Sequence, residues 1–208
     1  MDKITAHDTA KYIISELQDA GEAVSNIKLQ KLLYYVQGWH MGLYNKPVFN
    51  DEFQAWRNGP VIYDVFKEYE AFGSFNPITQ VIDRPNISEA LEKHIYEVLE
   101  CYGGESAFSL VALTHREWPW MEARGDLPLH ASSQNIISKD TMKDFFAAKA
   151  KENEETGNYI PNLDTIRAIE ESKKGIGTTT VNSWKEMFDE VYDELKSEGF
   201  EIPNYDRT

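Results

Sequence analysis

The sequence predicts a mainly α-helical protein: a compact helical domain over residues 1–150, a linker over residues 151–159 and a C-terminal helix–strand–helix arm over residues 160–208. Two observations predict this class. Apolar residues recur at helical spacing through most of the first part, and capping residues stand where these patterns begin. The segment KENEETGNYIPN is then polar and charged, which is typical of a linker.

Two helices are expected at the start of the chain. Over residues 7–19 the apolar side chains share one face, Asp8 suits the first turn, and Gly21 ends the helix. Residues 25–44 have the strongest helical pattern in the chain, and the segment NKP at residues 45–47 stops it. The predicted apolar face of this second helix consists of Leu29, Leu32, Leu33, Val36, His40 and Leu43.

A short extended or hairpin segment is expected between Val48 and Gly59, where the helical spacing is lost. Pro60 suits the first position of the next helix, because proline lacks the N–H that this position leaves unpaired. Gly73 would end that helix. Its predicted apolar face consists of Val61, Val65, Phe66, Tyr69 and Phe72.

Three more helices are expected before residue 150. Ser88 is a suitable N-cap for a helix that carries Leu91, Ile95, Val98, Leu99 and Tyr102. A short helix over residues 106–115 is followed by a turn through Trp118 and Pro119. Ser138 caps the last helix, which turns Met142, Phe145 and Phe146 inward.

The C-terminal arm is predicted to contain two helices and a short extended segment. Asn162 caps a helix that ends near Lys174, and the β-branched segment TTTVN covers residues 178–182. Ser183 and Glu186 form a capping box for the last helix. Such an arm either folds back onto the first domain or lays its apolar face into a groove on a partner protein.

The charge of the chain favours a basic partner. The 21 Lys and Arg residues face 35 Asp and Glu, a net charge of −14, which argues against a protein that clamps a phosphate backbone. Residues 151–208 alone contain seven basic and fourteen acidic residues, a net −7. We find neither a signal segment nor a span of membrane length, so a cytoplasmic protein without membrane association is expected.

Catalytic spacing is absent from the sequence. The five histidines show no HxxxH or HExxH pattern, and no glycine-rich phosphate loop is present. His40 is expected to be a packed, hydrogen-bonded core residue, and His115 to be structural or to contact a partner. Cys101 is the only cysteine, so neither an intrachain disulfide nor a thiolate metal cluster can form. We therefore expect no enzyme, no metal and no cofactor.

Residues 26–66, with LQKLLYYVQGWHMGLYNKPVFNDEFQAWRNGPV, and the later LTHREWPW resemble the Panacea domain of SocA-like and GepA-like antitoxins. The resemblance covers about residues 5–150. It implies a mainly helical domain encoded beside diverse toxins, which it neutralises. The residues that carry the signature, as structural or partner-contacting positions, are Leu32, Tyr35, Gln37, Trp39, His40, Trp56, Gly59, Pro60, His115 and Trp118.

The segment YIPNLDTIRAIEESKKGIGTTTVNSWKEMFDEVYDEL is similar to the toxin-binding arm of RelB/DinJ antitoxins. That resemblance implies a basic partner, a ribonuclease toxin of the RelE superfamily. The ribbon-helix-helix half of the RelB family is missing here, which puts operator binding in doubt. The partner-binding residues implied on the arm are Ile166, Ile169, Val181, Trp184, Met187, Phe188, Val191 and Leu195.

The sequence thus predicts an antitoxin of a type II toxin–antitoxin system that binds its cognate toxin directly. Two alternatives stay open: a DNA-binding transcriptional autoregulator, and a proteolytic adaptor that acts on a partner protein. For the former, a small basic patch could come from Lys28, Lys31, Arg57 and Lys67. Homo-oligomerisation is also left open.

Overall fold

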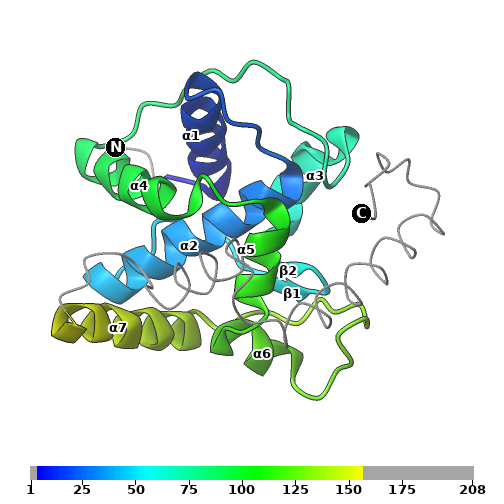
Figure 1. Ribbon diagram of the computed structural model, residues 1–208, viewed down its shortest axis with the longest axis vertical. Helices are drawn as coiled ribbons and strands as arrows, with labels where there is room; N and C mark the ends of the chain where they lie inside the picture. The colour runs from blue at the N-terminus through cyan, green and yellow to red at the C-terminus, as the bar shows by residue number, and fades with distance from the viewer. Residues whose placement is uncertain (1–3, 157–208) are drawn as a thin grey trace, which may run out of the picture. The chain divides into compact units, whose positions relative to one another are not determined.

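Seven α-helices and one short hairpin make up the part of the chain that the computed structural model describes, residues 4–156 (Figure 1). The predicted mainly helical class is confirmed, and the expected arm over residues 160–208 lies outside the described residues. In chain order the elements are α1 (Ala6–Asp19), α2 (Asn26–Tyr44), β1 (Gln54–Trp56), β2 (Gly59–Val61), α3 (Tyr63–Glu68), the 3-10 helix η1 (Glu70–Phe72), α4 (Glu89–Tyr102), α5 (Ala107–Thr114), α6 (Trp118–Arg124) and α7 (Lys139–Thr156).

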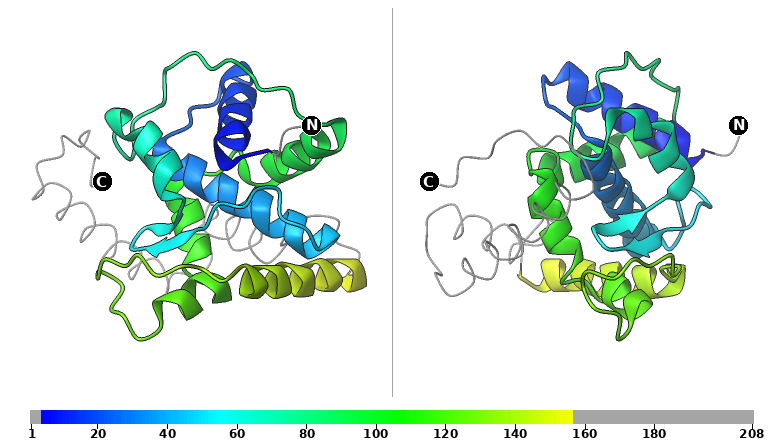
Figure 2. Two further views of the ribbon diagram at one scale, coloured as in Figure 1. Left: turned by 180° about the vertical axis from the view of Figure 1, so that it is seen from behind. Right: turned by 90° about the vertical axis from the view of Figure 1, so that its right-hand side faces the viewer.

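Helix α2 crosses the centre of the domain, with α1 and α4 on one side of it and α7 on the other (Figures 1 and 2). Fifteen of its nineteen residues are buried, so α2 is a core helix that is covered on all its faces. The sequence predicted a single apolar face. The buried surface of α2 is wider than that one face. The prediction was wrong for Leu43, which is 49% exposed near the helix end.

Side-chain caps define most of the helix starts. In α1 the Thr5 hydroxyl accepts from the Asp8 backbone N–H, and Asp8 accepts from the Thr5 N–H and hydroxyl. These bonds from Thr5 lower the pKa of Asp8. Ser25 accepts from the N–H of Lys28 at the start of α2. The predicted caps at Ser88 and Ser138 are confirmed by the same type of bond.

The hairpin is antiparallel, and it pairs Ala55 with Pro60. The prediction that Pro60 begins a helix was wrong, since Pro60 lies in β2 and α3 begins at Tyr63. Two polar side chains of α2 explain the difference. The Lys31 ammonium donates to the Pro60 carbonyl at 2.8 Å, and the Gln30 amide oxygen accepts from the Ile62 N–H at 2.9 Å. These bonds hold residues 60–62 extended across α2.

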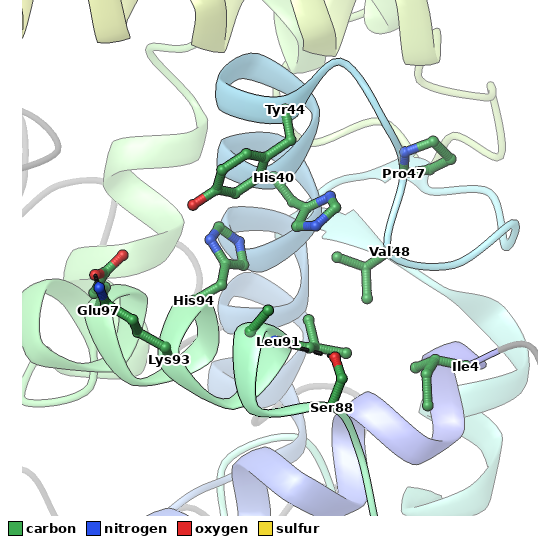
Figure 3. Close-up of a pocket in the computed structure, with 11 residues that line it drawn as sticks. Ile4, His40, Tyr44, Pro47, Val48, Ser88, Leu91, Lys93, His94 and Glu97 are labelled. Atoms are coloured by element: carbon green, nitrogen blue, oxygen red, sulfur yellow. Dashed lines mark hydrogen bonds and ion pairs between the residues drawn. The ribbon is translucent and has the colours of Figure 1, made fainter. Parts of the chain in front are cut away.

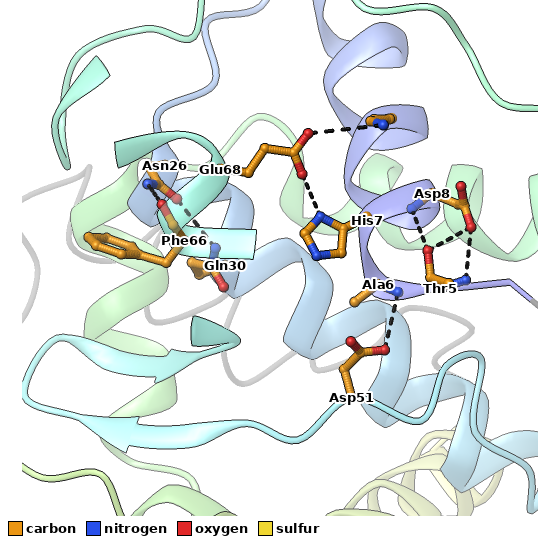
Figure 4. Close-up of polar contacts among 10 residues, drawn as sticks. Thr5, Ala6, His7, Asp8, Asn26, Gln30, Asp51, Phe66 and Glu68 are labelled. Carbon is orange, nitrogen blue, oxygen red and sulfur yellow. Dashed lines mark hydrogen bonds and ion pairs between the residues drawn. The ribbon is translucent and has the colours of Figure 1, made fainter. Parts of the chain in front are cut away.

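Polar contacts join α1, α2 and α3 (Figure 4). His7 on α1 pairs with the carboxylate of Glu68 on α3. The Asn26 amide at the start of α2 donates to the Phe66 carbonyl at 2.9 Å and accepts from Gln30 at 3.3 Å. These helices are therefore held by directed bonds as well as by apolar packing.

Helix α7 packs closely along α2, because two glycines of α2 face Phe146. A Cβ on Gly38 would lie 2.2 Å from the Phe146 ring, and a Cβ on Gly42 would lie 2.6 Å from its carbonyl carbon. Phe146 and Met142 are buried as predicted, whereas Phe145 is only half-buried.

The second half of the chain also departs from the prediction in two places. Helix α7 continues to Thr156, so the first six residues of the expected linker are helical; the domain division itself stays a prediction. Trp118 begins α6, with Pro119 in the first turn, where a turn was expected. Between residues 4 and 156 no helix is both long and apolar enough to cross a membrane.

Replacement of Gly42 by Ala is expected to destabilise the domain by about 1–2 kcal/mol, because overpacking against the α7 backbone outweighs the better helix propensity of Ala. Urea unfolding followed by circular dichroism measures the difference. Gly104→Ala is the control, since a Cβ there meets nothing within 4 Å. An equal loss in both variants would show that the close approach of α7 does not limit this position.

Candidate functional site

Most of the residues that carry the family signature lie in the interior of the domain. Leu32, Tyr35, Gln37 and Trp39 on α2 are between 0% and 2% exposed. Gln37 shows how such a residue acts. Its amide N–H donates to the Phe49 carbonyl at 2.9 Å, and its amide oxygen accepts from the Val48 N–H at 2.8 Å. The side chain therefore holds the extended segment against α2.

Lys31 is fully buried and has no acidic partner within salt-bridge distance among the described residues. Burial lowers its pKa well below the usual value of lysine. Gly59 makes room for this side chain: its φ is +92°, and an added Cβ would lie 2.6 Å from Lys31 Cε and 2.7 Å from Thr114 Oγ1. The signature Gly59–Pro60 therefore serves the close approach of the hairpin to α2.

Glu117 is a buried carboxyl, 6% exposed, at the N-cap position of α6. The Tyr35 hydroxyl donates to its Oε1 at 3.3 Å, while Oε2 and the Tyr34 hydroxyl lack hydrogen bonds of normal geometry. Tyr35 stacks on Tyr102 at 3.9 Å, and Trp39 Nε1 donates to the Tyr102 hydroxyl at 3.1 Å. Burial raises the pKa of Glu117 to about 7.

In the LTHREWPW segment, His115 is partly buried. Its ring stacks on Trp120 at 4.1 Å, and burial lowers the pKa of His115 to about 4, with the nearby Lys31 contributing. Trp120 Nε1 donates to the Trp56 carbonyl at 2.9 Å. Trp118, in contrast, is 55% exposed. Within this segment, Trp118 is therefore the more exposed of the two signature residues.

Arg124 is a structural residue that no sequence pattern singles out. Its guanidinium is buried and donates to four backbone carbonyls, those of Ala55, Pro128, Leu129 and Ala131. It shapes the loop after α6 and ties this loop to the hairpin. No local pattern marked Arg124, because Glu122 and Asp126 are charged neighbours in the sequence.

The predicted basic patch does not form. Lys31 is 0% and Lys28 6% exposed, because α2 is covered on all sides. Lys67 is exposed but pairs with Glu70. Arg57 is half-buried. The described residues therefore do not offer the cationic surface from which DNA binding was considered.

His40, unlike the other signature residues of α2, lies at the surface, in the wall of an open hollow of about 430 Å³ (Figure 3). Its Nδ1 is hydrogen-bonded to the Lys46 carbonyl at 2.6 Å. The neighbouring His94 is bonded through Nε2 to the Val36 carbonyl at 2.9 Å, and the two rings are 5.0 Å apart. His40 is hydrogen-bonded as predicted, but it is only partly buried.

Several of the buried polar side chains bind backbone atoms of the domain. Among residues 4–156 no three His, Cys, Asp or Glu side chains gather as a metal site would require. The Cys101 thiol has its pKa raised to about 11 by burial, which keeps it protonated at neutral pH. Lys31, Gln37 and Arg124 instead hold backbone groups in place.

The arm residues predicted to bind a partner lie outside the described residues. They are Ile166, Ile169, Val181, Trp184, Met187, Phe188, Val191 and Leu195.

Residues 29–121 match the family model described as "Antitoxin SocA-like, Panacea domain". The match runs from α2 into α6 and so includes the signature positions described above. The predicted resemblance to SocA-like antitoxins is thereby confirmed for this part of the chain.

Among curated proteins, Antitoxin SocA of Caulobacter vibrioides (strain NA1000 / CB15N) is 29% identical over 129 residues, which covers 56% of this chain and 69% of that protein. No solved structure matches.

Replacement of Lys31 by Met is expected to flatten the increase of stability with pH. The lowered pKa means that the unfolded state binds more protons than the folded state below the usual lysine pKa, so the free energy of unfolding rises as the pH approaches that value. Chemical unfolding between pH 7 and pH 10 measures this slope. Lys93→Met, at an exposed site on α4, should keep the wild-type slope; a wild-type slope in Lys31→Met would contradict the account.

Proposed function

We propose that this chain is an antitoxin that neutralises a cognate toxin by direct protein–protein binding. The observation that carries the proposal is the similarity to Antitoxin SocA, together with the Panacea-domain match over residues 29–121.

In this proposal the work is divided between two parts of the chain. The domain formed by the helices is a stable carrier, and residues 160–208 are the segment that grips the toxin. The support for the grip is the resemblance of that segment to RelB/DinJ arms and its amphipathic pattern, with Trp184, Met187 and Phe188 on the apolar side. Large aromatic and flexible apolar side chains commonly dominate interface energies.

The partner proposed is a small basic ribonuclease of the RelE type. The acidic excess of residues 151–208, a net −7, supports this choice, because a protein that holds RNA presents cationic side chains. An acidic arm would cover those side chains and so compete with RNA. The gene next to the one encoding this chain should accordingly encode a small basic protein.

Truncation after residue 155 is expected to abolish neutralisation. The toxin encoded beside the chain is expressed with either the full chain or residues 1–155, and growth is measured. Growth arrest with the shortened chain, at equal protein level, is the expected result. Rescue by the shortened chain would assign neutralisation to the helical domain and contradict the proposed role of the arm.

The double replacement Trp184→Ala and Phe188→Ala is expected to weaken the complex by several kcal/mol, since two buried anchors would be lost. Calorimetric titration of toxin into the full-length variant measures the affinity. Tyr96→Ala is the control, because Tyr96 is an aromatic residue on α4 that is 58% exposed. Equal affinity of the double variant and the control would rule out Trp184 and Phe188 as anchors.

A further inference from the structure

Glu117 occupies the junction between α6 and the rest of the domain. It is the N-cap residue of α6, yet its side chain makes no capping bond. The carboxyl points instead toward α2, where Tyr35 donates to it, and it is fully enclosed. The position of this one side chain therefore links the start of α6 to the central helix.

Ionisable groups from three elements face this carboxyl. Tyr34 and Tyr35 come from α2, Tyr102 from α4 and Lys149 from α7. Burial raises the pKa of all three tyrosines well above the usual value, so they remain neutral donors. Lys149 is the one cation of the four, and its charge favours the ionised carboxylate.

The hydrogen bonds are too few for a buried carboxylate. An ionised carboxyl normally accepts several hydrogen bonds when it is removed from water. Two tyrosine hydroxyls face Glu117 among the described residues: Tyr35 donates to Oε1 at 3.3 Å, and Tyr34 faces the carboxyl without normal hydrogen-bond geometry. A protonated carboxyl fits this surrounding better, because it is uncharged and needs fewer donors.

We propose that Glu117 is a proton-linked latch: the protonated side chain holds the first turn of α6 inside the domain, and transfer of its proton to solvent favours release of that turn. The moving part would be small. The far end of α6 stays tied by the four carbonyl bonds of Arg124 and by the bond from Thr141 to Glu122. Release would therefore uncover Pro119 and the Tyr35–Tyr102 pair.

Helix α6 also carries two exposed apolar residues, Trp118 and Met121, at 55% and 45% exposure. They lie one turn apart on the helix and so share a face. Release of the first turn would change the position and exposure of this face, because Trp118 directly follows Glu117. The shift of the Glu117 pKa from 4.5 to about 7 places the change in this pH interval.

The sign of the pH dependence follows from linkage. The pKa of Glu117 is raised from 4.5 to about 7 in the closed state, so closure is favoured below pH 4.5 and loses strength as the pH rises toward 7. Protection of the α6 amides from hydrogen exchange should fall by up to about tenfold per pH unit in this interval and level off above it.

Hydrogen exchange of the full-length protein, corrected for intrinsic rates, tests this between pH 5 and pH 8. Glu117→Gln should remove the pH dependence from residues 118–124, and Asp126→Asn, at an exposed carboxyl two residues after α6, should keep it. Burial lowers the pKa of both His94 and His115 to about 4, so these side chains gain charge toward low pH. Their effect on exchange is the same in all variants and is removed when the variants are compared. Equal pH dependence in wild type and Glu117→Gln would overturn the latch.

A second readout keeps the test decisive if Glu117→Gln folds poorly. Infrared spectra of wild-type protein with carbon-13 in the glutamate carboxyls should contain a protonated-carboxyl band that is lost near pH 7. Tyr35→Phe removes the donor to the carboxylate and should move that loss to higher pH. Absence of a protonated-carboxyl band at pH 6 would overturn the latch as well.

Discussion

The burial of α2 on all its faces is the constraint on which the rest of the domain depends. A helix in this position cannot leave its polar side chains in water, so leaving one without a partner inside the protein costs free energy. Gln30, Lys31 and Gln37 meet this requirement by binding the backbone of residues that follow α2 in the chain. The hairpin is therefore positioned by α2, and its own two short strands contribute little.

The same constraint shapes the contact with α7. Gly38 and Gly42 leave space on α2 into which Phe146 fits, and the ring of Phe146 meets Tyr34, Tyr35 and Trp39 edge-on. Such contacts are favourable for aromatic rings. Because Tyr35 also carries the hydrogen bond to Glu117, the packing of α7 and the placement of α6 share one side chain. A substitution that shifts α7 should therefore also change the packing of α6, and the reverse.

The sequence allowed the helices to be predicted far better than the hairpin or the buried charges. Spacing and caps are local properties, which is why the helix after Ser88 and the helix before Asn45 could be placed to within a residue or two. Pro60 was misplaced because its conformation is set by Lys31, twenty-nine positions away. Lys31 itself looked like a surface cation, since sequence spacing does not show how many neighbours will cover a helix. Glu117 and Arg124 were missed for the same reason.

The residues that carry the Panacea-like signature mainly build the interior of the domain. Six of the ten signature positions are buried, Trp118 is exposed, and His40, Trp56 and His115 are partly exposed. In the proposed function, residues 160–208, which lie outside the described domain, recognise the particular toxin. This arrangement would let one helical scaffold accompany different partners.

The central role of α2 is tested most directly by native-state hydrogen exchange, with the exchange rates compared between the helices. If the domain is built around this helix, the amides of α2 from Leu29 to Trp39 should exchange only through global unfolding and be the slowest in residues 4–156. Their opening free energy should equal the global free energy of unfolding. Faster exchange in α2 than in α1 or α4 would contradict the account.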